Sequence, residues 1–129
     1  MPERIQKSRQ RTWRKDHPDA IDVSRPNWLG NPFAIYEHCK GKNGDWGVKD
    51  LGRLHAPIGH GWTKLGAINA AVSAYKAEID HQYPEGSTAR HILANTLRGH
   101  DLVCWCPLDR PCHADVLLEL ANTESSATP

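Results

Sequence analysis

The stretch from 101 to 121, DLVCWCPLDRPCHADVLLELA, constrains the fold of this chain more than any other segment. Its apolar run at 102–105 is typical of a strand that is covered on both faces. Pro107 and Pro111 bracket a short loop, and a proline at or before the first helical position favours a helix that begins near Cys112. The stretch therefore predicts a strand, a tight loop and a helix that bring several chemically active side chains together.

The remaining segments predict an α/β protein. Residues 20–24 (AIDVS) alternate as a short strand does, and Thr63–Tyr83 carries apolar residues at three- and four-residue steps, which indicates a helix whose stripe packs in the core. Ser87 or Thr88 caps a second helix that ends at Gly99. A length of 129 residues suits one domain. We expect a single small domain with a mostly parallel sheet flanked by helices.

The composition divides the chain into a domain and three special segments. Residues 1–19 form a basic N-terminal arm, because six Arg or Lys stand against one Glu in the first 15 positions. Residues 37–62 hold six glycines and little periodicity, and we expect a Gly-rich insertion there. The α/β domain then spans 1–122, and residues 123–129 are expected to be a disordered tail.

Charge and cysteine content limit the classes of partner. The net charge of +1 gives the whole molecule no strong attraction for nucleic acid, although the basic arm with Trp13 could contact phosphates and stack on a base. A plain solvated arm is the alternative. No run of 18 apolar residues and no signal-peptide pattern occurs, so we expect no membrane partner. Four cysteines without an export signal indicate the cytoplasm, where thiols stay reduced.

Three interpretations of the cysteine stretch remain open. In the first, Cys104, Cys106, Cys112 and His113 form a zinc site, since C-x-C-x5-C-H supplies four suitable ligands. In the second, Cys112 at a helix N-terminus is a reactive thiolate, with His113 or Asp115 as its base or orienting group. In the third, the cysteines pack in the core, and backbone amides at the helix start bind an anion.

A second set of candidate residues lies in the loop at 25–33, RPNWLGNPF, which leaves the predicted strand at 20–24. Ligands of α/β folds usually bind at such strand ends. Arg25 can hold a phosphate or carboxylate, Trp28 can stack, and Asn31 can pair with a base or sugar. The alternative is a turn in which Trp28 and Phe33 belong to the core.

Residues 98–122, RGHDLVCWCPLDRPCHADVLLELAN, closely resemble the closing signature of domain-of-unknown-function family 4326, a small bacterial and phage family. The segments ERIQKSRQRTWRK and SRPNWLGNPF resemble the opening of that family, although Ser24 stands where Gly is common and Leu29 separates Trp28 from Gly30. The resemblance implies that both ends meet at one site. That site would combine Arg14, Arg25, Trp28, Asn31 and Phe33 with Cys104, Cys106, Cys112, His113 and Asp115.

The first functional hypothesis is an enzyme acting on a nucleotide or nucleobase, with a glycosidic bond as a candidate point of attack. Arg14 and Arg25 would hold phosphate, while Cys112, His113 and Asp115 would perform the chemistry. The alternative is a non-enzymatic, zinc-stabilised module that binds a nucleotide, or nucleic acid through the arm. A third hypothesis is a small interaction protein whose Gly-rich segment presents two exposed tryptophans, Trp46 and Trp62.

Overall fold

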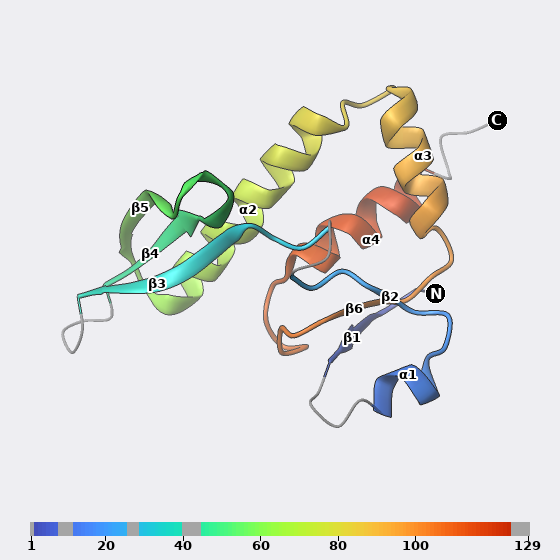
Figure 1. Cartoon of the computed structure of the whole chain (residues 1–129), viewed down its shortest axis with the longest axis horizontal. Helices are drawn as coiled ribbons and strands as arrows, with labels where there is room; N and C mark the ends of the chain where they lie inside the picture. Colours follow the sequence, from blue (N-terminus) through green and yellow to red (C-terminus); the bar gives the residue numbers. More distant parts are fainter. Residues whose placement is uncertain (1, 8–11, 26–28, 40–44, 125–129) are drawn as a thin grey trace.

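The computed structural model describes residues 2–7, 12–25, 29–39 and 45–124, which form two three-stranded sheets connected by a long helix (Figure 1). One sheet is parallel, with the order β1-β6-β2, and the other is antiparallel, with the order β3-β4-β5. The predicted α/β class and small single domain are confirmed. A mostly parallel sheet is not, because half of the described strands belong to the antiparallel sheet.

The parallel sheet joins the two ends of the chain. Its central strand β6 (Leu102–Cys104) lies between β1 (Arg4–Gln6) and β2 (Ile21–Asp22), and all three residues of β6 are buried. A hydrogen bond of 2.7 Å from the Lys7 amide to the Cys104 carbonyl extends the β1–β6 pairing. The carboxyl ends of the three strands therefore meet at one edge of the sheet.

The basic N-terminal arm and the end of the chain both contribute elements to the fold. Within 1–19 lie strand β1 and helix α1 (Thr12–Asp16), so the described part of the arm belongs to the folded domain. Helix α4 (His113–Glu124) runs past the predicted boundary at 122, and residues 125–129 lie outside the described residues. Helix α3 (Thr88–Leu97) begins as predicted, since the Ser87 side chain accepts a hydrogen bond from the Arg90 amide.

The Gly-rich segment 37–62 is largely an antiparallel meander. Strands β3 (Phe33–Cys39), β4 (Asp45–Asp50) and β5 (Ala56–Trp62) pair in sequence, with the short 3-10 helix η1 (Leu51–Arg53) between the last two. Gly47 in the central strand allows close packing, because a Cβ there would lie 2.6 Å from Cζ of Tyr36 and 2.7 Å from the Gly59 carbonyl oxygen.

Helix α2 (Lys64–Gln82) connects the two halves of the fold: it packs on the antiparallel sheet and contacts α4, which in turn packs on the parallel sheet (Figure 1). Ala67 and Ala71 in its first half are buried against the antiparallel sheet, while Tyr75 and Ile79 in its second half join the main core with α3, α4 and the parallel sheet. The predicted core stripe is therefore confirmed in the second half. It is wrong at the start of the helix, where Leu65 is 51% exposed.

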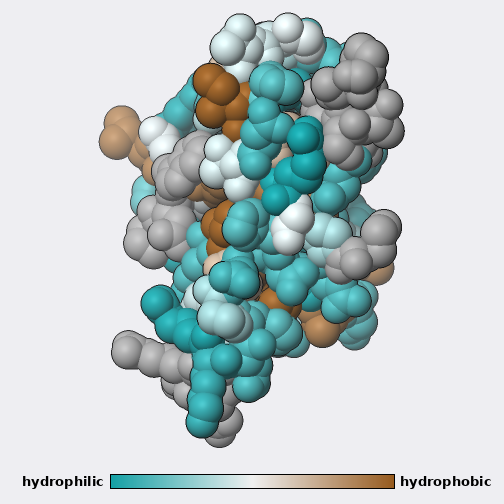
Figure 2. Space-filling model, turned by 90° about the vertical axis from the view of Figure 1, so that its right-hand side faces the viewer, coloured by the Kyte–Doolittle hydropathy of each residue, from teal (hydrophilic) through white to brown (hydrophobic). Residues whose placement is uncertain are grey.

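A helix that crosses a membrane needs about 20 predominantly apolar residues. No helix in the described ranges is long and apolar enough to cross one. On the face drawn in Figure 2, hydrophilic residues predominate and apolar residues occur in separate patches.

Candidate functional site

A cavity of about 420 Å³ lies between the two sheets. Helix α2 contributes one wall through Ile68 and Val72, and β3 contributes another through Phe33 and Ile35. The third wall is the carboxyl edge of the parallel sheet together with the cysteine loop, residues 105–111. Cavities of roughly 300–1,000 Å³ are typical of small-molecule sites.

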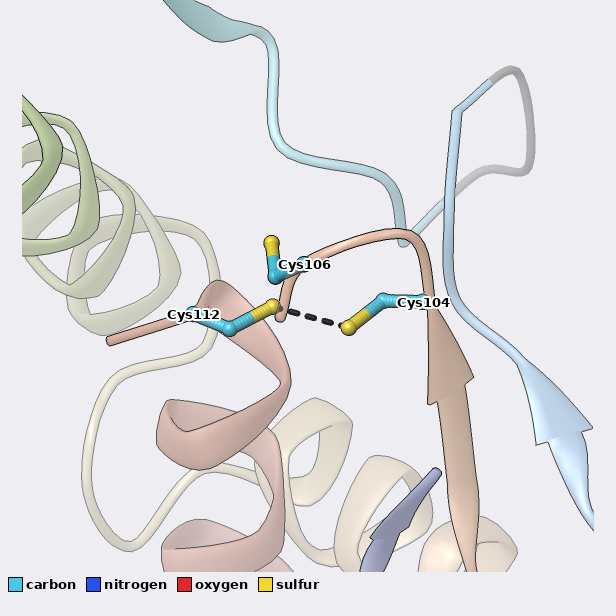
Figure 3. A group of neighbouring side chains, drawn as sticks. All are labelled: Cys104, Cys106 and Cys112. Atoms are coloured by element: carbon cyan, nitrogen blue, oxygen red, sulfur yellow. Dashed lines mark hydrogen bonds between the residues drawn. The ribbon is translucent and has the colours of Figure 1, made fainter. Parts of the chain in front are cut away.

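Three cysteines converge at the third wall and form what we call the thiol cluster (Figure 3). Cys104 ends β6, Cys106 lies in the cysteine loop, and Cys112 immediately precedes α4. Their sulfur atoms all lie within 4.8 Å of one another, and the Sγ atoms of Cys104 and Cys112 are 3.0 Å apart. Three sulfur ligands at this spacing can hold a metal ion.

Two thiols of the cluster have pKa values that are shifted in opposite directions. Hydrogen bonds from the thiols of Cys104 and Cys112 lower the pKa of Cys106, and the charge of Arg4 adds to this effect, although burial acts in the opposite direction. The corresponding hydrogen bonds with Cys106 and Cys112 raise the pKa of Cys104, as does its burial. Of these two thiols, Cys106 is therefore the one that more readily carries the negative charge.

His113 is buried and held in a fixed orientation. Its Nε2 atom lies 2.7 Å from the Val23 carbonyl oxygen, and because a carbonyl only accepts hydrogen bonds, Nε2 must carry the hydrogen. Its Nδ1 atom lies 3.5 Å from Sγ of Cys112, and the ring makes an edge contact with Tyr75. His113 does not join the group of mutually close ligand atoms found among the described residues. Of the four predicted metal ligands, the structure therefore brings only the three cysteines into one mutually close group.

Asp115 stabilises the start of α4. Its Oδ2 atom accepts a hydrogen bond of 3.1 Å from the Cys112 amide and forms an ion pair of 3.1 Å with Arg4. An acidic side chain three residues into a helix often binds back to the capping amide in this way. Asp115 is not among the described residues that line the cavity. Its predicted catalytic role thus has no support from its position.

Arg4 fixes the cysteine loop and was not identified from the sequence. Its guanidinium donates hydrogen bonds to the carbonyl oxygens of Pro107, Leu108 and Arg110 at 3.0, 2.9 and 2.7 Å. The side chain is only 8% exposed. Its partners lie more than 100 positions away in the sequence, so no local pattern could have identified it.

The structure brings Arg25, Asn31 and Phe33 to the cavity that the thiol cluster also lines. The Asn31 amide has local partners, since Oδ1 accepts from the Phe33 amide at 2.9 Å and Nδ2 donates to the Ala71 carbonyl at 3.4 Å. Arg14 lies on α1 and does not line the cavity. Trp28 lies outside the described residues.

The electrostatics of the cavity favour an anion. Arg25, Lys64 and Arg110 line it, and none of its described lining residues is Asp or Glu. Among the ion pairs of the described chain, none involves Arg25 or Arg110. Two guanidinium groups therefore remain available to a negatively charged ligand.

A second polar cluster supports the same edge of the sheet. Nζ of Lys7 lies 2.7 Å from Oδ2 of Asp22, 3.2 Å from Oγ of Ser24, and 5.0 Å from the centre of a Trp105 ring. Burial alone would raise the pKa of Asp22, but hydrogen bonds from Lys7 and Ser24 lower it overall. Ser24 and Trp105 also line the cavity, so this cluster positions part of its wall.

Fold and site together define a small α/β protein with a thiol cluster on the wall of a cationic cavity. The model of the domain-of-unknown-function family DUF4326 matches residues 5–123, and the chain belongs to this family, as the resemblance predicted. Neither a curated protein nor a solved structure matches the chain.

Proposed function

We propose that the protein is a cytoplasmic enzyme that binds a nucleotide or nucleobase derivative in the cavity and acts on it through the thiol cluster. A glycosidic bond remains the predicted point of attack. The observation that carries the proposal is a cavity with an apolar wall and two cations that have no ion-pair partner among the described residues: Phe33, Ile35 and Ile68 suit a flat base, while Arg25 and Arg110 suit a phosphate. A reducing compartment is part of the proposal, since clustered thiols persist there.

The contact between Cys112 and His113 supports a chemical role for the cluster. The Sγ–Nδ1 distance of 3.5 Å places a nucleophile beside a base, and the Val23 carbonyl orients that base from its other side. This is the arrangement by which thiols are activated in nucleophilic catalysis. Arg14 has no part in the proposal, because it does not line the cavity.

Equilibrium binding of nucleoside monophosphates, with the matching nucleosides for comparison, tests the proposal. Arg25→Met and Arg110→Met should each weaken monophosphate binding by roughly tenfold or more, because each removes a charged hydrogen-bond donor. Arg53→Met is the matched control, since its side chain is 79% exposed and lies outside the lining. Equal affinity for nucleosides and monophosphates, unchanged in both variants, would contradict the proposal.

A second candidate is the zinc-stabilised binding module, and the mutual approach of the three sulfur atoms favours it. Thiolate ligands suit zinc and do not suit magnesium or calcium. A structural zinc contributes to folding, so chelation should unfold such a module. Its predicted nucleic-acid surface is reduced, because Arg4 and Lys7 of the basic arm bind internal partners. A weak salt dependence of nucleic-acid affinity would argue against this surface.

A further inference from the structure

We infer that Cys104, Cys106 and Cys112 bind a zinc-class divalent metal ion through three thiolates and leave its fourth coordination position open to the cavity. The inference deepens the proposed function and rests on it, because the metal would lie on the wall of the cavity assigned to the nucleotide. In the metal-bound protein Cys112 is a ligand, so the ion takes the place of the free Cys112 thiolate as the reactive group. The inference differs from the second candidate, in which four protein ligands close a structural zinc site.

The positions of the sulfur atoms are close to those that a metal requires. Tetrahedral zinc at about 2.3 Å from each sulfur places the sulfur atoms about 3.8 Å apart. The three Sγ atoms already lie within 4.8 Å of one another, from a strand end, a loop and a helix start (Figure 3). The Cys104–Cys112 separation of 3.0 Å would widen by roughly 0.8 Å, a small side-chain adjustment.

The two nearby side chains that could supply a fourth ligand lie outside the group of three sulfur atoms. The Val23 carbonyl orients the His113 ring through Nε2 and leaves Nδ1 3.5 Å from Sγ of Cys112, while Asp115 binds Arg4 and the Cys112 amide. Neither has an atom within the mutually close group found in the described part of the chain. Three protein ligands with one free position is the ligand count of a catalytic zinc site.

The free position faces the cavity. All three cysteines line it, and Cys106 is half-buried, whereas Cys104 and Cys112 are only 1% exposed. A metal bound to these sulfurs would meet the protein core on one side and the cavity on the other. Water or an electron-pair donor of the bound ligand could therefore complete its coordination.

The fold supports the site without the metal. Arg4 fixes the cysteine loop through three carbonyl oxygens, and a core shared by α2, α3, α4 and the parallel sheet lies behind it. Three thiolates and a divalent ion carry one net negative charge, which the Arg4 guanidinium can offset. We therefore expect the metal-free protein to remain folded, unlike a domain that depends on structural zinc.

Cobalt(II) is the probe that tests the coordination number. Protein stripped of metal under reducing conditions should bind about one cobalt ion per chain and develop thiolate-to-cobalt absorption with tetrahedral visible bands. Addition of imidazole should then shift the visible bands, because it enters the open position. Visible bands that do not respond to imidazole would indicate a closed site, and absence of cobalt binding would overturn the inference entirely.

Variants identify the ligands. Cys104→Ser, Cys106→Ser and Cys112→Ser should each lose the cobalt spectrum, while Cys39→Ser, the matched control, should retain it. His113→Gln should keep both the stoichiometry and the imidazole response. Loss of the spectrum in His113→Gln, with circular dichroism unchanged, would assign the fourth position to His113 and contradict the open site.

Thiol protection in the wild-type protein provides a test that does not depend on any variant folding. Zinc should slow the reaction of three of the four thiols with a disulfide reagent by at least an order of magnitude, and equal rates with and without zinc would overturn the inference.

The metal site and the proposed function can fail separately. Cobalt binding without nucleotide binding would contradict only the proposed function, and nucleotide binding without cobalt binding would contradict only the metal site.

Discussion

The Arg4 side chain fixes the conformation of the cysteine loop through three hydrogen bonds to its carbonyl oxygens. We expect Arg4→Met to lower the free energy of unfolding by roughly 1–3 kcal/mol, because it removes three charged hydrogen bonds to carbonyl groups of the cysteine loop and leaves Asp115 without its ion-pair partner. Urea unfolding measures this change. Arg53→Met, whose ion pair is exposed, should change stability by less than about 1 kcal/mol. Equal effects of the two variants would show that the loop holds its conformation without Arg4.

Asp22 gives the protein a pH-dependent contribution to stability. Its pKa is lowered in the folded state, against the effect of burial, by hydrogen bonds from Lys7 and Ser24. The contribution is therefore fully present above the unfolded value of about 3.9 and is lost as the pH falls through the lower folded value. Asp22→Asn should be less stable than the wild type by about 1–2 kcal/mol at pH 7.

Urea unfolding of both proteins between neutral and acidic pH measures the difference for Asp22. The stability gap between wild type and Asp22→Asn should narrow on acidification below about pH 4. A gap that stays constant across this range would mean that the carboxylate charge contributes nothing.

Residue types identified the thiol cluster from the sequence, but not the partners that organise it. Cysteines at positions 104, 106 and 112 form a local pattern, so their convergence followed from a strand, a loop and a helix. Arg4 and Val23 act through tertiary contacts with distant residues and carry no local signal. Asp115 was selected for its charge, whereas its carboxylate binds the helix start and Arg4.

Strand β4 has no room for a side chain at position 47. Gly47→Ala should destabilise the antiparallel sheet by about 1–3 kcal/mol, because the added methyl group would meet Tyr36 and the Gly59 backbone at less than 3 Å. Thermal unfolding compares it with Gly52→Ala, where the nearest atom, Oδ1 of Asp50, lies at 3.3 Å. Equal melting temperatures would show that the sheet can move apart at no cost.

The helices were predicted better than the antiparallel sheet, for a physical reason. Strong caps at Thr63 and Ser87 mark the starts of α2 and α3 in the sequence. Strand β5 is an edge strand whose residues are mostly exposed, so it lacks the alternation that reveals a strand. The stripe on α2 was assigned to the core, yet Ile68 and Val72 line the cavity. Periodicity identifies an apolar face but not whether protein or ligand covers it.

The cavity takes its walls from both sheets and the helix between them, so a bound ligand should affect distant segments together. Saturating nucleoside monophosphate should slow amide hydrogen exchange in β3 and in the cysteine loop, because both line the cavity. Helix α3 contributes no lining residue and serves as the internal control. Slower exchange in only one of the two segments would place the ligand outside the shared cavity.

The pairing of β1 and β2 with β6 has a consequence for the synthesis of the protein. The middle strand of the parallel sheet is made last, about 80 to 100 residues after the strands on either side of it. Until the ribosome releases residues 102–104, the two early strands have no partner, and their backbone groups stay unpaired. Helix α2 and the antiparallel meander use contacts that are closer in sequence and can form earlier. The thiol cluster is therefore completed in the final stage of folding.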